Sequence, residues 1–252
     1  KEAKRLGADY IATGHYAKIE NGQIMKAKDS NKDQTYFLSQ LNRKQLENVL
    51  FPLGDIEKSE VRKIASEYGL ITAEKKDSTG ICFIGERHFK EFLTNYMPKE
   101  DGDIVDISTG KVLGKHNGLM YYTIGQRKGL DIGGNKERLF VVGKDLAKNV
   151  LYVSLGDDNS YLLSDSCIID SVNFNCDIRP EKCTAKFRYR AEEYPVILEY
   201  LEDGKILVRY DNVQIKAVTP GQACVLYLDQ LCLGGGIIEE VRKNNEKLWY
   251  LL

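Results

Sequence analysis

Cys82 is the side chain in this sequence with the clearest capacity for nucleophilic chemistry. It lies between Gly80 and Gly85, in a segment that separates two predicted helices, where a loop could expose a thiolate. Basic residues precede and follow it: Lys75, Lys76, Arg87 and His88. Nearby positive charge lowers the pKa of a thiol and makes the thiolate available as a nucleophile. The alternative is that the apolar neighbours bury this segment and that Cys82 only packs.

Two earlier segments carry residue types that suit a nucleotide or a nucleic acid. Gly14 permits close approach of the backbone to a ligand, and His15 can donate to a base or a phosphate. The polar loop at residues 29–37 offers Lys32 for phosphate and Gln34 for a base edge. The same residue types are common at ordinary strand ends and in loops that only face solvent, so both interpretations stay open.

Two acid-free stretches, residues 107–130 and 182–191, mix bases with aromatic rings. The first contains Lys111, Lys115, Arg127 and Lys128 together with His116, Tyr121 and Tyr122. On a strand, the period of two would place Lys186, Arg188 and Arg190 on one face as a phosphate ladder. Bases mixed with stacking rings suit single-stranded or looped RNA. The alternative is the charged solvent face of an ordinary strand.

The composition of the chain limits the classes of protein to which these residues can belong. The chain has 252 residues, 36 basic and 37 acidic, and a net charge of −1, which allows two domains or three small ones. A neutral chain cannot hold nucleic acid through bulk charge, so any such binding must be local. The sequence contains no apolar run of the ~18 residues that a membrane span needs and no signal-peptide pattern. We therefore expect a cytoplasmic protein with no membrane partner.

The cysteine spacing gives no sign of a metal site or of a disulfide framework. None of the six cysteines forms a C-x2-C pair, and a chain of 252 residues does not need covalent staples. Five of them lie in strand-like runs and are interpreted as small buried side chains: Cys167, Cys176, Cys183, Cys224 and Cys232. The sequence predicts no bound metal cofactor.

The first hundred residues predict helices around a short buried strand. A helix ended by Gly7, a strand at residues 8–13 and a glycine loop are typical of a parallel α/β sheet, in which ligands bind at the carboxyl ends of strands. Asn42 is expected to cap a helix over residues 43–50, and Ser59 to cap a helix that Gly69 ends. A third helix is expected over residues 89–96. One strand cannot make a sheet, so we expect the chain to be the C-terminal part of a longer protein.

The rest of the chain predicts β-structure. Strands are expected at residues 103–107, 139–142 and 150–155, with a turn at residues 108–110, and a hairpin is expected at residues 194–200 and 205–210. Short strands at intervals of ~8–12 residues favour a small barrel. The expected fold is therefore a partial α/β domain, then a small central β-rich domain and a C-terminal β-barrel.

In this order, the segments resemble the tRNA-specific 2-thiouridylases, which thiolate the wobble uridine of certain tRNAs. The matching stretches are ATGHYA at residues 12–17, SNKDQTYFL at 30–38, FPLG at 51–54, DSTGICFIGER at 77–87, GLMYYTIGQRKG at 118–129, FRYR at 187–190 and AVTPGQ at 217–222. The resemblance implies three domains: part of a PP-loop ATP-pyrophosphatase domain at residues 1–97, a central tRNA-binding domain at 98–159 and a β-barrel at 160–252.

The resemblance also implies a mechanism. ATP, with Mg²⁺, adenylates the uracil 2-oxygen, and a persulfide on Cys82 delivers the sulfur. A cysteine desulfurase loads that persulfide directly or through a relay protein, and a second family cysteine resolves it and can form a disulfide with Cys82. Gly14 matches a nucleotide-binding position. The positions that match tRNA contacts are His15, Lys32, Asp33, Gln34, Arg188, Tyr189 and Gln222.

The sequence departs from the family pattern in one important respect. It contains no Ser-Gly-Gly-x-Asp-Ser phosphate loop, no base-contacting Asn/Asp loop and no upstream catalytic cysteine. We expect all three to precede Lys1, and we expect this chain alone to lack thiolation activity. Two other functions stay open from the residues themselves: a non-catalytic RNA-binding module in which Cys82 packs, and a different PP-loop ATP-dependent ligase or amidase.

Overall fold

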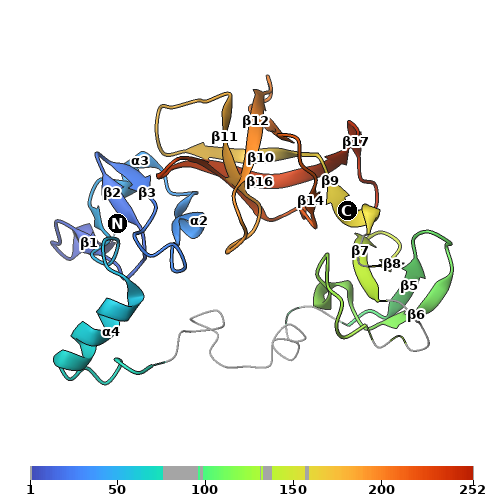
Figure 1. Cartoon of the computed structure of the whole chain (residues 1–252), viewed down its shortest axis with the longest axis horizontal. Helices are drawn as coiled ribbons and strands as arrows, with labels where there is room; N and C mark the ends of the chain where they lie inside the picture. The colour runs from blue at the N-terminus through green and yellow to red at the C-terminus, as the bar shows by residue number, and fades with distance from the viewer. Residues whose placement is uncertain are drawn as a thin grey trace. The chain divides into compact units, whose positions relative to one another are not determined.

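The computed structural model describes residues 2–75, 96, 99–130, 132, 138–156 and 159–251 (Figure 1). The chain forms two compact units, and each is described by itself. The first unit comprises residues 1–76, 168–211 and 221–239, and the second comprises residues 77–167, 212–220 and 240–252. The predicted helix at residues 89–96 and Cys82 lie outside the described residues.

The amino-terminal part of the first unit is a small α/β structure. It contains α1 (Glu2–Arg5), β1 (Ile11–Ala12), β2 (Lys18–Glu20), β3 (Gln23–Met25), α2 (Thr35–Leu38), α3 (Arg43–Leu46), β4 (Val49–Leu50) and α4 (Lys58–Glu67). The strands β1 and β4 pair in parallel, with Ile11 opposite Val49. Both residues of β1 are exposed, so the expectation that this strand is buried is wrong. The parallel pair and the helices around it are those of an α/β domain, as the sequence predicts.

The helix ends show which local signals the sequence carries. Asn42 caps α3 as predicted, in a reciprocal pair with Gln45, but this helix ends at Leu46 because the chain then enters β4. The predicted cap at Ser59 is wrong. The helix α4 begins at Lys58, whose backbone N–H donates to Asp29 Oδ2 at 3.1 Å, so a distant loop supplies the acceptor.

The remainder of the first unit is a closed six-stranded barrel. Its strands are β10 (Ser166–Phe174), β11 (Lys182–Lys186), β12 (Tyr194–Tyr200), β13 (Ile206–Tyr210), β15 (Ala223–Leu228) and β16 (Leu231–Lys243). They follow the order β10-β13-β12-β11-β15-β16, and β16 pairs back with β10. The predicted hairpin and the predicted barrel are confirmed. Closure leaves no open sheet edge among these six strands.

The α/β part and the barrel share one hydrophobic core. Met25 at the end of β3 pairs with Leu231 of β16, so the short β2–β3 hairpin continues the barrel sheet. One cluster of buried side chains draws on both parts: Ala17, Ile24, Tyr36, Leu38, Leu46, Val225, Tyr227 and Cys232. In Figure 1, α2 and β3 accordingly lie beside the barrel strands, and α4 extends away from them. Burial of this shared core fixes where α2 lies relative to the barrel.

The second unit is built on a four-stranded sheet. It contains β5 (Gly102–Asp106), β6 (Val112–His116), β7 (Leu139–Asp145) and β8 (Val150–Leu155) in the order β6-β5-β8-β7, with the short pair β9 (Leu163–Ser164) and β14 (Ile215–Lys216), the 3₁₀ turns η1 (Leu119–Tyr121) and η2 (Ser160–Leu162), and β17 (Glu246–Lys247). The predicted strands are present. The predicted turn before Gly110 is also present, with the Gly110 N–H donating to Asp106 O at 2.8 Å. This sheet is the predicted central β-rich domain.

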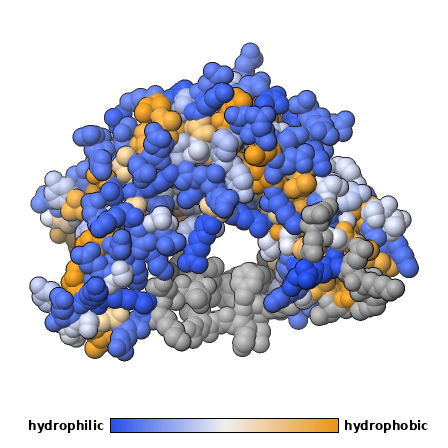
Figure 2. Space-filling view, in the orientation of Figure 1, coloured by the Kyte–Doolittle hydropathy of each residue, from blue (hydrophilic) through white to orange (hydrophobic). Residues whose placement is uncertain are grey.

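The face of the protein seen in Figure 2 is largely polar and the described cysteines are free thiols, as the composition leads us to expect. Figure 2 shows a largely hydrophilic face with separate hydrophobic patches. In the part of the chain that the structure describes, no helix has the length and apolar character to span a bilayer. The five described cysteines are free; Cys183 is half-buried and the other four are buried. The interpretation of these five as packing residues is confirmed.

Gly54 allows the tightest backbone contact of the α/β part. A Cβ at this position would overlap the carbonyl oxygen of Ala17, whereas a Cβ at Gly14 would lie 3.9 Å from Leu53 Cδ1. We therefore expect Gly54→Ala to lower the free energy of unfolding of the intact protein by about 1–3 kcal/mol, the usual cost of overpacking. Urea denaturation measures this, with Gly14→Ala as the matched control that changes little. Equal stability of the two variants would contradict the contact.

Candidate functional site

The helix α2 brings together two segments that the sequence predicts separately. The Gln34 N–H donates to Tyr16 O at 2.9 Å, and the Tyr16 N–H donates to Gln34 Oε1 at 2.9 Å. This two-way contact holds the loop that carries His15 against the start of α2. The His15 ring is oriented by Thr13 Oγ1, 2.9 Å from Nδ1, and by the edge of Phe51, with 6.0 Å between ring centroids.

Asp33 shapes the loop before α2. It is buried, and its Oδ2 accepts from the Ala27 N–H at 2.8 Å, while Oδ1 accepts from Thr35 Oγ1 at 2.5 Å and from the Thr35 N–H at 3.3 Å. The Thr35 hydroxyl has one proton, and it uses that proton in the bond to Asp33. The Tyr227 hydroxyl, 3.2 Å from Thr35 Oγ1, is therefore the donor in the bond between Tyr227 and Thr35. Both oxygens of Asp33 already have partners inside the protein. Lys32, next to it, is partly exposed. Direct RNA contact by either residue stays a prediction.

Three aromatic rings meet where α2 reaches the segment after β11. The rings of Phe37 and Tyr189 lie 4.4 Å apart at 47°, and Tyr36 lies 6.2 Å from Tyr189. The Tyr36 hydroxyl donates to Ala223 O at 2.9 Å, directly after the exposed Gln222. Burial raises the pKa of Tyr36 to about 12, so the hydroxyl stays a neutral donor. Tyr189 and Gln222 thus lie near the same buried side chain, that of Tyr36.

Two arginines flank these rings. Arg188 is half-buried, and burial lowers the pKa of its guanidinium, which still carries its charge because arginine titrates so high. Arg190 is exposed, and its guanidinium carbon lies 5.3 Å from the centroid of the Tyr189 ring. The pair gives this edge of the barrel two cations beside the aromatic cluster.

The predicted phosphate ladder on residues 186, 188 and 190 is wrong. The strand β11 ends at Lys186, and the chain then bends and turns, so the period of two does not continue. The ammonium of Lys186 is directed inward, 3.6 Å from Glu193 Oε1 and 5.3 Å from the centroid of the buried Tyr227 ring. Only the two arginines remain as surface cations of that pattern.

A charge cluster beneath α2 was missed by sequence reasoning. Lys26 Nζ lies 2.6 Å from Glu193 Oε1 and 4.7 Å from the centroid of the Tyr227 ring. Thr184 Oγ1 donates to Glu193 Oε2 at 2.6 Å. Burial raises the pKa of the Glu193 carboxyl, but the hydrogen bonds from Lys26 and Thr184 and the charges of Lys26 and Lys186 outweigh it, so the pKa is lowered. The only sequence signal is an acidic pair that follows the acid-free stretch.

The other acid-free stretch does not present the predicted stacking rings. Tyr121, Tyr122 and His116 are buried in the second unit. His116 Nδ1 accepts from the Gly118 N–H at 3.1 Å, its Nε2 lies 3.1 Å from Asn149 O, and burial lowers the pKa of the ring. These rings form a core, so their interpretation as an RNA platform is wrong.

Of the bases in this stretch, two lie on an ordered loop. Arg127 and Lys128 are exposed. The side chain of Gln126 closes the loop that carries them, because Oε1 accepts from the Thr123 N–H and Nε2 donates to Lys128 O, both at 2.9 Å. The loop therefore presents its two cations from a fixed backbone.

The predicted nucleotide position lies at the carboxyl end of β1. Gly14 follows this strand and is exposed, and a Cβ there would make only an ordinary contact with Leu53 Cδ1 at 3.9 Å, so the fold itself does not require glycine at this position. Ligands of parallel sheets bind at this end of the strands. The exposed Gly14 backbone suits one edge of a nucleotide, but the sequence has no glycine-rich loop for the phosphates. Nucleotide binding at Gly14 stays a prediction.

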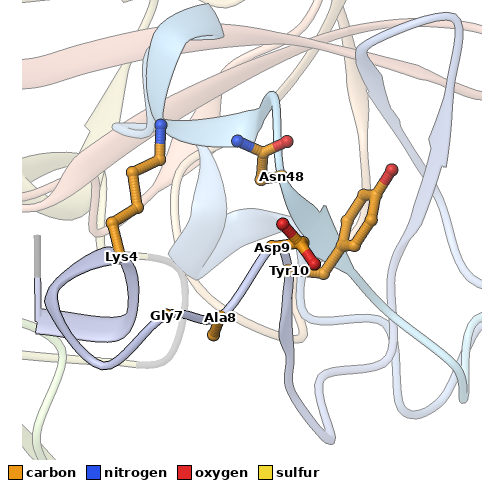
Figure 3. A pocket seen from close by; sticks show the side chains of 6 residues that line it. All are labelled: Lys4, Gly7, Ala8, Asp9, Tyr10 and Asn48. Carbon is orange, nitrogen blue, oxygen red and sulfur yellow. The ribbon is translucent and has the colours of Figure 1, made fainter.

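A pocket of 540 Å³ lies at the opposite, amino end of these strands. Figure 3 shows the side chains that line it, with Lys4 coming from α1 and Asn48 from the residue before β4. The other lining residues are Gly7, Ala8, Asp9 and Tyr10. None of the predicted site residues lines this pocket. Within the described ranges, no group of three or more His, Cys, Asp or Glu side chains is arranged to hold a metal ion.

Three family descriptions match successive parts of the chain. Residues 1–86 match a tRNA methyl transferase HUP domain, residues 90–155 a tRNA methyl transferase PRC-barrel domain, and residues 164–238 an aminomethyltransferase β-barrel domain. These matches follow the order of the α/β part, the central sheet and the barrel. The boundaries at residues 97 and 159 stay predictions.

Relatives match along the full length of the chain. It is 54% identical to the tRNA-specific 2-thiouridylase MnmA of Geobacillus thermodenitrificans, over 100% of this chain and 69% of that protein. The chain belongs to the tRNA-specific 2-thiouridylase family. The relative of the same name from Lysinibacillus sphaericus has the same identity and coverage, and that from Mycoplasmopsis synoviae is 52% identical over 98% of this chain and 66% of its own length.

Membership of the 2-thiouridylase family confirms the resemblance that the sequence motifs indicate. The chain spans about two thirds of the relatives' length, as expected of part of a longer protein. Eight of the predicted site residues lie in the first unit: Gly14, His15, Lys32, Asp33, Gln34, Arg188, Tyr189 and Gln222. The exposure and orientation of Cys82, and the disulfide in which the resemblance places it, stay predictions.

The Glu193 cluster predicts a pH dependence of stability. Because the folded-state pKa of this carboxyl lies below its ordinary value of 4.5, its contribution is complete above that pH and is lost as pH falls through the folded pKa. We expect Glu193→Gln to lower the free energy of unfolding by about 1–2 kcal/mol at pH 7, because it leaves Lys26 with a weaker partner. The difference from wild type should shrink towards pH 3, as measured by urea denaturation.

Glu199→Gln is the matched control on the same barrel. Glu199 pairs with Arg209 at 3.4 Å, and its side chain is 57% exposed. An exposed pair of this kind contributes little, so this variant should resemble wild type at each pH. A Glu193→Gln effect that stayed constant from pH 7 to pH 3 would show that the charge of Glu193 is not its source.

Proposed function

We propose that this chain binds tRNA and carries the sulfur in a tRNA-uridine 2-sulfurtransferase that thiolates the wobble uridine. The observation that carries this proposal is the role of α2, which joins the His15 loop, the Lys32–Gln34 segment and the Arg188–Tyr189 turn of the barrel in one unit. Similarity to 2-thiouridylases over the full length of the chain supports the reaction class.

Each group of residues has a distinct role in this proposal. The cations Lys32 and Arg188 contact phosphates, and His15 and Gln222 contact bases or ribose edges, because polar side chains at such edges position RNA. Gln34 holds the His15 loop through Tyr16 and is in place to meet the RNA next to it. Asp33 fixes the backbone of this segment through its bonds to Ala27 and Thr35.

Cys82 carries the sulfur. A cysteine desulfurase, directly or through a relay protein, supplies a sulfane sulfur that forms a persulfide on its Sγ. ATP, which would be held with Mg²⁺ beside Gly14, would transfer its adenylyl group to the uracil 2-oxygen with release of pyrophosphate, and that oxygen would then leave as part of AMP. The terminal sulfur of the persulfide then bonds to C2 as AMP leaves. The second family cysteine bonds to Cys82 Sγ and breaks the S–S bond, which leaves thiouridine and a disulfide that a cellular thiol reduces.

The described thiols support the choice of Cys82 as carrier. Burial raises the pKa of both Cys183 and Cys232 to about 12, so they stay protonated at neutral pH. Cys167, Cys176 and Cys224 are buried. A donor enzyme needs an exposed thiolate, and none of these five provides one.

A non-catalytic RNA-binding module would differ from the proposed enzyme in the role of one residue, Cys82. We expect Cys82→Ser in the intact protein to abolish thiolation of tRNA and to leave tRNA affinity within about twofold of wild type, because only the sulfur carrier is lost. Thiolation is measured by the mobility of the product tRNA on a mercury-containing gel, and affinity by filter binding. Cys183→Ser is the control that retains activity. Full activity of Cys82→Ser would contradict the proposal and favour the module.

The second prediction concerns the thiolation activity of the isolated 252-residue chain, whose sequence contains no phosphate loop. The isolated 252-residue chain should show no ATP-dependent thiolation, because its sequence has no glycine-rich loop for a triphosphate. The gel assay with ATP, tRNA and a sulfide donor measures this. Product formation by the isolated chain would show that the adenylation machinery lies within these residues.

A further inference from the structure

Phe37 differs from the rest of its helix. The other three residues of α2, Thr35, Tyr36 and Leu38, are buried, whereas the Phe37 side chain is 57% exposed. Phenylalanine has no polar atom that would favour contact with water. The shared core of the first unit therefore holds α2 in place and leaves one apolar ring at its surface.

The exposed ring rests on a rigid base. Phe37 packs against Tyr189 with ring centroids 4.4 Å apart, and it meets Tyr36 edge-on at 5.6 Å and 88°. Tyr36 is itself fixed by its hydrogen bond to Ala223 O. An aromatic cluster with one anchored member and one exposed member loses little side-chain entropy when a flat group stacks on it.

The charges around this cluster favour an anionic, planar ligand. Arg190 lies 5.3 Å from the centroid of the Tyr189 ring, and Arg188 precedes that residue in the chain. The nearby acid Glu193 is neutralised by Lys26 and Lys186. Unpaired RNA bases stack on aromatic rings and on arginine, and their phosphates pair with cations.

We propose that Phe37 and Tyr189 form a stacking platform for one unpaired nucleobase of the substrate RNA, with Arg190 at the adjoining phosphate. This inference rests on the proposed function and adds Phe37 to the residues that contact RNA. Stacking tolerates every base because each has a π face, so the platform selects an unpaired base and not its identity.

The test compares an RNA hairpin shaped like an anticodon arm with a fully paired RNA duplex of the same length. A 2-aminopurine in the hairpin loop reports stacking through quenching of its fluorescence. Phe37→Leu keeps an apolar side chain of similar size but has no π face. We expect this variant of the intact protein to bind the hairpin about tenfold more weakly and to lose the quenching, with duplex affinity unchanged.

Phe37→Trp should retain hairpin affinity and quenching, which separates loss of the ring from a fault in folding. Tyr68→Leu is the matched control, because Tyr68 is an aromatic side chain of the same unit, 79% exposed on the surface after α4. This control should bind both RNAs as wild type does. The platform would be refuted if Phe37→Leu bound the hairpin with wild-type affinity and quenching, or if it weakened hairpin and duplex equally.

The failure of this inference can be told apart from failure of the proposed function. If wild type thiolates tRNA and binds the hairpin while Phe37→Leu behaves identically, only the platform is refuted. If wild type neither thiolates tRNA nor binds the hairpin, the function is refuted and the platform with it.

Discussion

The candidate site depends on the hydrogen bonds that the buried Asp33 carboxylate accepts. A helix of four residues is not stable alone, because nucleation costs more than one turn returns. Asp33 offsets this cost by accepting from the Ala27 and Thr35 amides and from the Thr35 hydroxyl, and Thr35 in turn accepts from Tyr227 of the barrel. This carboxylate acts together with the shared core, which buries Thr35, Tyr36 and Leu38, to hold α2 where it presents Phe37.

The sequence predicts features whose cause is local. The cap at Asn42 and the hairpin of β12 and β13 depend on residues within a few positions of one another, and both are present. The sequence does not predict the helix start at Lys58 because the acceptor there, Asp29, lies 29 residues away in the chain. The strand pattern fails after Lys186 because β11 ends there and the chain bends and turns over residues 187–190, so the period of two has no strand on which to continue.

The same distinction between local and distant causes decides which residues of the candidate site the sequence can predict. Polar motif residues such as Gln34 stand out by type, but the partner of Gln34, Tyr16, and the ring that packs on Tyr189, Phe37, become meaningful only once the fold places them. Residue type misleads where burial decides the role. Tyr121 lies beside bases in the sequence as an RNA-stacking residue would, yet it packs in a core, whereas Phe37 has the type of a core residue and lies at the surface.

The charge balance explains how a neutral chain can select one RNA. With a net charge of −1, long-range attraction to RNA is weak, so affinity must come from a few short-range contacts. The ion pairs of Glu193 remove Lys26 and Lys186 from the surface charge, which leaves Arg188 and Arg190 as the cations beside the aromatic rings. Because stacking requires an unpaired base within reach of these cations, shape and not bulk charge decides which RNA binds.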